Sequence, residues 1–277
     1  MYRNLLVHIP TERSPRPAIE GAISLAMACG AHLDAIAVGY ESFNNVPFLA
    51  EGGAAVAAVF EHERERALER ANASLAVFEV EAKAAKIAYR CHAMTGSFAE
   101  ASDIVSGNAR LCELTVVSQP EPGLEMFDNL LPREILFQSG GPVIFIPYTF
   151  RGVFKTRRIG ICWDGSRLAA RALWDAMPLL FKADTLRIIS VNGPVSAEAS
   201  PARLAERLAG FGLQAKTISL QSVQIGIQPA ILSAAADEAL DLLVMGGYGH
   251  SRLKEMVLGG VTREMFQSMT VPTLMSH

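Results

Sequence analysis

The stretch DLLVMGGYGHSRLKEMVLGGVTREMF, residues 241–266, carries the clearest fold signal in the chain. Its apolar start, residues 241–246, is typical of a buried strand, and residues 260–269 have helical spacing. Between them the glycines follow the pattern Gly246-x2-Gly249-x9-Gly259-Gly260. Glycines between a strand and a helix let the backbone approach a phosphate, and the helix N-terminus offers unpaired N–H groups. The stretch predicts a parallel α/β sheet with a phosphate-binding loop. Glycine turns that only allow tight strand exits are the alternative.

Outward from this stretch, short apolar runs alternate with longer helical patterns. We expect strands at residues 4–9, 33–39, 86–92, 113–118, 142–146, 158–163, 185–191, 215–220, 241–246 and 271–275. We expect helices at residues 17–29, 54–84, 97–110, 131–139, 166–182, 200–210, 226–238 and 260–269. This alternation is the signature of βαβ units and a parallel sheet.

The two halves of the pattern also correspond in sequence. Arg133-Glu134 stands nine residues before Pro142, and Arg263-Glu264 stands nine residues before Pro272. Such a match indicates a repeat. We therefore predict two tandem doubly wound domains, residues 1–150 and 155–277, each with a five-stranded parallel sheet. The fifth strands are apolar edges that need covering, so we expect them to pair with each other and form an intrachain pseudo-dimer.

A carboxylate ends the first strand of the second half, in the sequence IGICWDGS (residues 159–166). In a doubly wound sheet, ligands bind beyond the carboxyl ends of the strands, where the strand order reverses. If the first and fourth strands flank that point, Asp164 and the glycine loop face one crevice. Asp164 could then accept a hydrogen bond from a ribose hydroxyl or an adenine amine. The alternative is an Asx turn or a helix cap, with Ser166 placed to cap the next helix.

In these residues the second half resembles a universal stress protein domain of the ATP-binding type. That family has Gly-x2-Gly-x9-Gly-Ser/Thr after the fourth strand and an Asp at the end of the first. The resemblance implies an adenine nucleotide alpha hydrolase-like fold and a site for ATP, or for AMP or ADP, with Mg²⁺. The residues it assigns to that site are Trp163, Asp164, Val191, Met245, Gly246, Tyr248, Gly249, His250, Gly259, Gly260, Val261 and Thr262.

One position departs from the family pattern. Gly260 stands where the family has Ser or Thr. This change removes one hydroxyl from the implied phosphate cradle but keeps the backbone N–H. It puts phosphate affinity in question more than nucleotide binding itself.

The first half resembles the family in layout but not in its site. Pro10 occupies the position of Asp164, the fourth strand exits as SQPEP (residues 118–122), and Asn129-Leu130 replace the last glycine pair. Proline offers no N–H donor, and Glu121 would repel a phosphate. We predict that residues 1–150 form a degenerate, structural domain.

Composition excludes several functions. Twenty-five Lys and Arg against 28 Asp and Glu give a net charge of −3, which does not favour a nucleic-acid partner. The chain has no apolar run of the ~18–20 residues that a membrane helix needs, and its first ten residues do not resemble a signal peptide. We predict a cytoplasmic protein without a membrane partner. The four cysteines do not have zinc-site spacing, so no metal ligands are assigned.

Three functions remain open from the sequence. The first is a stress-response regulator that binds an adenine nucleotide and acts on an unknown protein partner. The second is a slow ATPase, for which His250 is a weak acid–base candidate and no catalytic residue is assigned. The third is a scaffold that binds no nucleotide. A homodimer of the two-domain chain is also left open.

Overall fold

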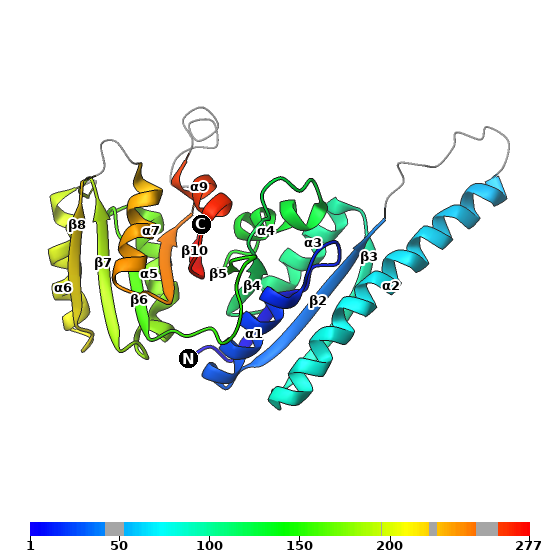
Figure 1. Ribbon diagram of the computed structural model, residues 1–277, viewed down its shortest axis with the longest axis horizontal. Helices are drawn as coiled ribbons and strands as arrows, with labels where there is room; N and C mark the ends of the chain where they lie inside the picture. The colour runs from blue at the N-terminus through cyan, green and yellow to red at the C-terminus, as the bar shows by residue number, and fades with distance from the viewer. Residues whose placement is uncertain (42–52, 195, 222–225, 248–259) are drawn as a thin grey trace.

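The computed structural model describes residues 1–41, 53–194, 196–221, 226–247 and 260–277, with side chains from residue 57 onward in the second of these ranges. Within them, ten strands form one continuous sheet with helices on both faces (Figure 1). The strands are β1 (Asn4–His8), β2 (His32–Tyr40), β3 (Tyr89–Gly96), β4 (Leu114–Ser118), β5 (Val143–Ile146), β6 (Arg158–Cys162), β7 (Thr185–Val191), β8 (Ala215–Leu220), β9 (Leu242–Gly246) and β10 (Thr273–Ser276).

The helices follow the strands as βαβ connections. They are α1 (Arg16–Cys29), α2 (Gly53–Ala85), α3 (Phe98–Ala109), α4 (Phe127–Gln138), α5 (Arg167–Leu180), α6 (Pro201–Ala209), α7 (Ile227–Asp237) and α9 (Val261–Ser268), with a short 3₁₀ helix, η1 (Ala197–Ala199). The predicted α/β class is confirmed.

The sheet order is β3-β2-β1-β4-β5-β10-β9-β6-β7-β8. Within each half all strands are parallel, and the first strand lies between the second and the fourth. The strand order therefore reverses between β1 and β4 in the first half, and between β6 and β9 in the second. The condition set for the predicted crevice, that the first and fourth strands flank the reversal point, is confirmed.

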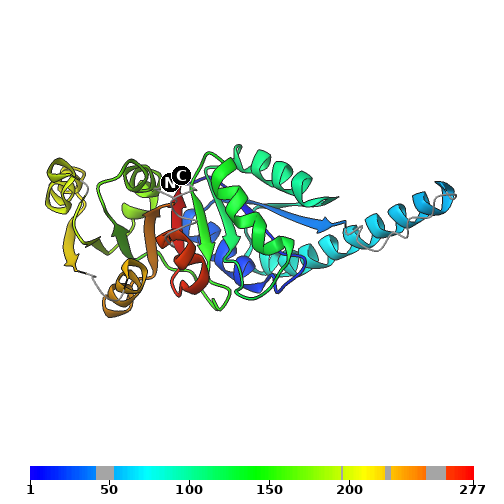
Figure 2. The same ribbon diagram turned by 90° about the horizontal axis from the view of Figure 1, so that it is seen from above.

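The two halves meet through their fifth strands. β5 and β10 pair antiparallel, with Ile144 opposite Leu274 at the centre of the register. Both side chains are fully buried. The predicted intrachain pseudo-dimer is confirmed, because each edge strand is covered by the other (Figures 1 and 2).

Two hydrophobic cores lie on opposite faces of the sheet, and both cross from one half to the other. One core joins α1, α2, α5 and α6 and includes Phe78 and Leu180. The other joins α3, α4, α7 and α9 and includes Leu131 and Phe266. Burial on both faces explains why the central strands are nearly continuous apolar runs.

The long helix α2 extends past the sheet at its N-terminal end (Figures 1 and 2). Its residues Ala67, Ala71, Leu75 and Phe78 are buried, whereas Leu68 is 40% exposed. Val59 and Phe60 are 41% and 40% exposed, because the sheet does not reach that end of the helix. The charged run at residues 61–66 is largely exposed.

Two elements differ from their predicted bounds by more than two residues. The third strand runs from 89 to 96 rather than from 86 to 92, since α2 continues to Ala85 and Lys86 turns the chain with a φ of 55°. Helix α4 begins at Phe127 rather than at 131 and contains Pro132. Pro132 cannot donate to the carbonyl of Asp128, and Arg13 Nη2 donates to that oxygen instead, at 3.2 Å. A contact distant in sequence thus allows the helix to start early.

Among the described helices, none is both long and apolar enough to cross a membrane.

Candidate functional site

A pocket of about 170 Å³ lies at the carboxyl ends of β6, β7 and β9, where the strand order reverses. This volume is more than ten times the ~10–15 Å³ that admits one water, so a ring system can enter. The pocket opens on the face of the sheet that α7 and α9 cover. Its lining residues are Cys162, Trp163, Asp164, Ser166, Leu168, Ala169, Ile189, Val191, Ile227, Ile231, Met245, Gly246, Val261 and Thr262.

Most of the described site residues expected from the sequence meet here. Seven line the pocket, namely Trp163, Asp164, Val191, Met245, Gly246, Val261 and Thr262. Gly260 precedes α9 as its N-cap residue. The remaining four, Tyr248, Gly249, His250 and Gly259, lie outside the described residues. Strands β6, β7 and β9 thus bring together residues that are up to 99 positions apart in the chain.

Asp164 forms the Asx turn that was one of its two sequence interpretations, and its contact with a nucleotide stays a prediction. Its Oδ1 accepts a hydrogen bond of 2.8 Å from the backbone N–H of Ser166, which is an Asx turn. The hydroxyl of Ser166 in turn accepts from the N–H of Ala169 and caps α5. Asp164 remains exposed at the pocket. The turn fixes the direction of the carboxylate and leaves Oδ2 for a ligand donor.

The ring of Trp163 has a structural partner. Its Nε1 donates to the carbonyl oxygen of Ala199 in η1, at 2.7 Å, and the residue is 8% exposed. Trp163 also belongs to the hydrophobic core on the α5 and α6 face, together with Ala169, and both residues line the pocket. The hydrogen bond to Ala199 thus fixes the indole at the border between this core and the pocket.

Gly246 is required by packing. A Cβ at this position would lie 2.7 Å from the backbone nitrogen of Ala169 and 2.7 Å from the carbonyl carbon of Leu168. Both atoms are backbone atoms of the first turn of α5 and cannot move independently. Gly246 thus brings the end of β9 against α5, which supports the tight-exit interpretation at this glycine.

The N-terminus of α9 forms the polar end of the pocket. Gly260 has an extended conformation (φ −77°, ψ 146°) and no side chain to cap the helix. Val261 and Thr262, the first two residues of α9, line the pocket. The first N–H groups of a helix have no intrahelical acceptor and carry the positive end of the helix dipole. This end of the pocket can receive an anion.

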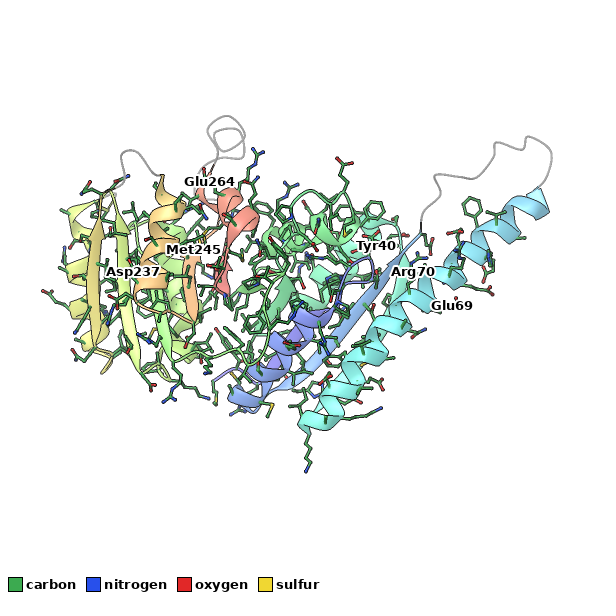
Figure 3. All side chains as sticks on the ribbon, viewed as in Figure 1. Tyr40, Glu69, Arg70, Asp237, Met245 and Glu264 are labelled. Carbon is green, nitrogen blue, oxygen red and sulfur yellow. The ribbon has the colours of Figure 1, made fainter. Side chains whose placement is uncertain are left out.

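Apolar side chains form the other walls. Ile189, Val191 and Met245 come from the strands, and Met245 lies inside the second half (Figure 3). Ile227 and Ile231 come from the first turns of α7. The sequence analysis did not assign the two isoleucines. A signal for them was available in the sequence: they are four residues apart at the start of α7, so they lie on one face of a helix that covers the crevice.

Cys162 is the last residue of β6 and also lines the pocket. Burial, with a smaller contribution from the charge of Asp164, raises the pKa of its thiol to about 12. The thiol therefore stays protonated at neutral pH and is a poor nucleophile. Its role in the pocket is that of a small apolar surface.

At the equivalent crevice of the first half, side chains of the loop after β1 and of α4 each bind the backbone of the other. Asp128, fully buried near the N-terminus of α4, accepts two backbone hydrogen bonds on Oδ2, from Thr11 and Glu12, both at 2.7 Å. The hydroxyl of Tyr40 donates to Oδ1 at 3.1 Å. In return, Glu12 Oε2 accepts from the N–H of Asp128 at 3.0 Å. These bonds tie the loop after β1 to α4, across the place where the second half has its pocket.

Arg13 and His8 complete this buried cluster. The guanidinium of Arg13 donates to the carbonyl oxygens of Ser118 and Gln119 at the end of β4. Nε2 of His8 lies 3.7 Å from Oδ1 of Asp128, and the residue is 1% exposed. Burial, assisted by the charge of Arg13, lowers the pKa of His8 to about 3. His8 is therefore neutral at physiological pH.

No group of three or more His, Cys, Asp or Glu side chains that could hold a metal ion occurs in the described parts of the chain.

Comparison with known proteins identifies the second half. A model of the Universal stress protein family matches residues 155–277. This segment is similar to universal stress protein domains. The matched segment contains the whole pocket, from Cys162 to Thr262. The resemblance predicted from the glycine pattern and Asp164 is confirmed.

One curated relative, Universal stress protein Slr1230 of Synechocystis, is 28% identical over 139 residues. The match covers 48% of this chain and 46% of that protein, so the chain spans about half the length of the curated relative it matches.

Solved structures extend the likeness in fold to the whole chain. A universal stress protein from Archaeoglobus fulgidus has a TM-score of 0.75 at 17% identity, covering 98% of this chain and 95% of its own. A putative universal stress protein from Pseudomonas aeruginosa has a TM-score of 0.58 at 16% identity, covering 99% and 93%. At these identities the comparison establishes the fold of the chain.

Proposed function

We propose that the second half of the chain binds an adenine nucleotide, ATP or its di- or monophosphate, in the pocket at the ends of β6, β7 and β9. One observation carries this proposal: seven residues chosen from the sequence pattern line a single pocket at the point where the strand order reverses. Open α/β sheets bind their ligands at that point.

The residues present fit such a ligand. A planar base is accommodated between the apolar side chains of β7 and β9 and those of α7. Oδ2 of Asp164 can accept from a ribose hydroxyl or the adenine amine, and the N-terminus of α9 can receive phosphate oxygens. Since no described cluster of protein side chains holds a metal, Mg²⁺ would arrive with the phosphates.

The first half, residues 1–150, is proposed to be a degenerate domain without a nucleotide. The bonds of Asp128, Glu12 and Arg13 support this assignment, because they fill and tie together the crevice where a ligand would bind. A nucleotide phosphate there would also meet the buried carboxylate of Asp128.

At the level of the cell, the proposal is a cytoplasmic regulator of a stress response whose nucleotide state is read by a protein partner. The rationale is the family of residues 155–277 together with a binding pocket that has no assigned catalytic group. Slow ATP hydrolysis with His250 as the acid–base group stays a prediction, because His250 lies outside the described residues.

The deciding experiment is isothermal titration of nucleotide-stripped protein with MgATP. One site per chain is expected. Asp164→Ala removes a charge-assisted hydrogen bond and should weaken binding by about 1.5–3 kcal/mol, or roughly tenfold to a hundredfold. Asp103→Ala, which removes an exposed carboxylate from α3, is the matched control and should bind as the wild type does.

Each other result has a definite meaning. Equal affinity of Asp164→Ala and the wild type would remove Asp164 from the site. Absence of heat with the wild type would favour the scaffold. Phosphate release above background that His250→Ala abolishes would make the protein an ATPase.

A further inference from the structure

The pseudo-symmetry of the sheet makes Gln119 and Gly247 equivalent. Gln119 directly follows β4, and Gly247 directly follows β9. The backbone N–H of Gln119 donates to the carbonyl of Ile146 at 2.7 Å, and that of Gly247 donates to the carbonyl of Ser276 at 2.9 Å. Each residue thus extends its strand by one hydrogen bond toward the last residue of the fifth strand.

Their side chains break this symmetry at the junction of the halves. Nε2 of Gln119 donates to the backbone carbonyl of Phe266 in α9, at 2.8 Å. Gly247 has no side chain to return such a bond, and a Cβ there would come within 3.0 Å of Cδ2 of Leu136 in α4. At these two equivalent positions, a side chain of the first half bonds to a helix of the second half, and the second half makes no corresponding side-chain bond.

The amide of Gln119 is fixed in orientation. The residue is 0% exposed, and its Oε1 accepts from the backbone N–H of Tyr148 at 3.3 Å. A backbone N–H can only donate and a carbonyl can only accept, so Oε1 must face Tyr148 and Nε2 must face Phe266. The carbonyl oxygen of Gln119 also accepts from Arg13, which belongs to the closed crevice of the first half.

Helix α9 is short, and its other end borders the pocket. It has eight residues, or about 12 Å at 1.5 Å per residue. A second buried amide, Gln228 of α7, donates to the hydroxyl of Ser268 at 2.8 Å, and the ring of Phe266 packs on Phe145 with centroids 4.7 Å apart. So short a helix moves as one piece, and an anchor at Phe266 also sets the position of Val261 and Thr262.

We propose that Gln119 is a positioning residue for the nucleotide pocket of the second half. The first half, which binds no nucleotide itself, uses Gln119 to hold α9 where its N-terminal N–H groups and Thr262 face the ligand's phosphates. This inference rests on the proposed function. It gives the closed first half a role in binding.

The test compares Gln119→Leu with Gln138→Leu, a matched amide-to-leucine change in α4 whose Nε2 lies 3.3 Å from Ser102 Oγ, away from α9. Binding of ATP and of adenosine is measured for both. Gln119→Leu should weaken ATP binding about fivefold to tenfold and adenosine binding less than about twofold, because the lost bond positions the phosphate end of the pocket. Gln138→Leu should change neither.

Two further measurements keep the inference separable from the proposed function. Amide hydrogen exchange of α9 is recorded without nucleotide, and Gln119→Leu should accelerate it at least about fivefold relative to Gln138→Leu. Gln119→Glu keeps the acceptor for Tyr148 but, when ionised, cannot donate to Phe266, and it should behave as Gln119→Leu does.

Some outcomes test the role of Gln119, and others test the proposed function. Equal weakening of ATP and adenosine binding, or unchanged exchange in α9, would overturn the role of Gln119. If the wild type binds no nucleotide, the proposed function fails, and the exchange measurement alone decides whether Gln119 anchors α9.

Discussion

Ile144 of β5 and Leu274 of β10 face each other at the centre of the only antiparallel strand pair among the described strands. Both side chains are 0% exposed and lie in the core that α1 and α5 cover. The two residues occupy equivalent positions in the two halves, so the pseudo-two-fold axis of the chain passes between them. Residues 147–157 connect the two halves along the chain. The pairing of β5 with β10 joins their sheets.

Ile144→Lys should therefore disrupt the junction. The substitution buries an ammonium group without an acceptor, and we expect a loss of at least about 3 kcal/mol in the free energy of unfolding. Ile144→Val, which only removes a methylene, should cost about 0.5–1.5 kcal/mol. Chemical denaturation of both variants checks this. A Lys variant with wild-type stability would show that the strand pair does not hold the halves together.

Gly246→Ala and Gly247→Ala compare the cost of a methyl group that meets backbone atoms with the cost of one that meets a side chain. At Gly246 the new methyl group meets backbone atoms of α5 at 2.7 Å, and at Gly247 it meets only the end of a leucine side chain at 3.0 Å. We expect Gly246→Ala to lower the unfolding free energy by about 1–3 kcal/mol and Gly247→Ala by less than about 1 kcal/mol. Denaturant titration is the measurement. The reverse ranking would contradict the packing role of Gly246.

Gly260→Ser should improve the end of the pocket that receives phosphate. The extended backbone of Gly260 suits a serine N-cap, and the family resembled by this sequence has Ser or Thr there. The added hydroxyl should stabilise the protein by a few tenths of a kcal/mol and tighten ATP binding about twofold to tenfold. Gly260→Ala, which adds a Cβ without a hydroxyl, controls for backbone stiffening. Serine and alanine variants with the same ATP affinity would remove this position from the phosphate site.

His8 should make the protein less stable in acid. Its pKa is about 3 when buried in the folded protein, against about 6.5 in the unfolded chain. Between these values the unfolded state binds more protons at this residue, so stability falls as the pH falls. From about pH 7.5 to about pH 5, the wild type should lose about 2 kcal/mol more than His8→Gln.

The pH profile needs its own reference. His62→Gln, on the exposed part of α2, measures the effect of removing a histidine far from the cluster. Unfolding free energies at several pH values are compared for the three proteins. A His8→Gln profile parallel to that of the wild type would show that His8 does not titrate as its burial requires.

Much of the fold followed from local patterns. Strands at 185–191 and 215–220 were predicted to the residue, because β-branched and apolar residues between turn residues favour a strand. The repeat predicted the pairing of the fifth strands, since two apolar edges in one chain have each other as the nearest cover. Boundaries were missed where distant contacts decide them: Arg13 allows α4 to start at Phe127 by satisfying a carbonyl that Pro132 leaves free.

The candidate site divides in the same way. Asp164 could be assigned because the ends of parallel strands meet at one edge of the sheet, and the family resemblance implied Val191 and Thr262, which line the same pocket. Ile227 and Ile231 were not assigned, although their four-residue spacing in a helix that covers the crevice was a signal for them. The direction of the Trp163 ring was also hidden, because it depends on the carbonyl of Ala199, 36 residues away.

The sequence by itself determined the alternation of strands and helices, the repeat, and the chemical character of the second half's pocket, because these depend on residues close together in the chain. Only the tertiary structure decided that Asp128 and Arg13 tie together the loops at the first half's crevice, and that Gln119 reaches Phe266. Those hydrogen bonds join residues 115 to 147 positions apart. Their partners are backbone atoms, which every residue has, so no sequence pattern can single them out.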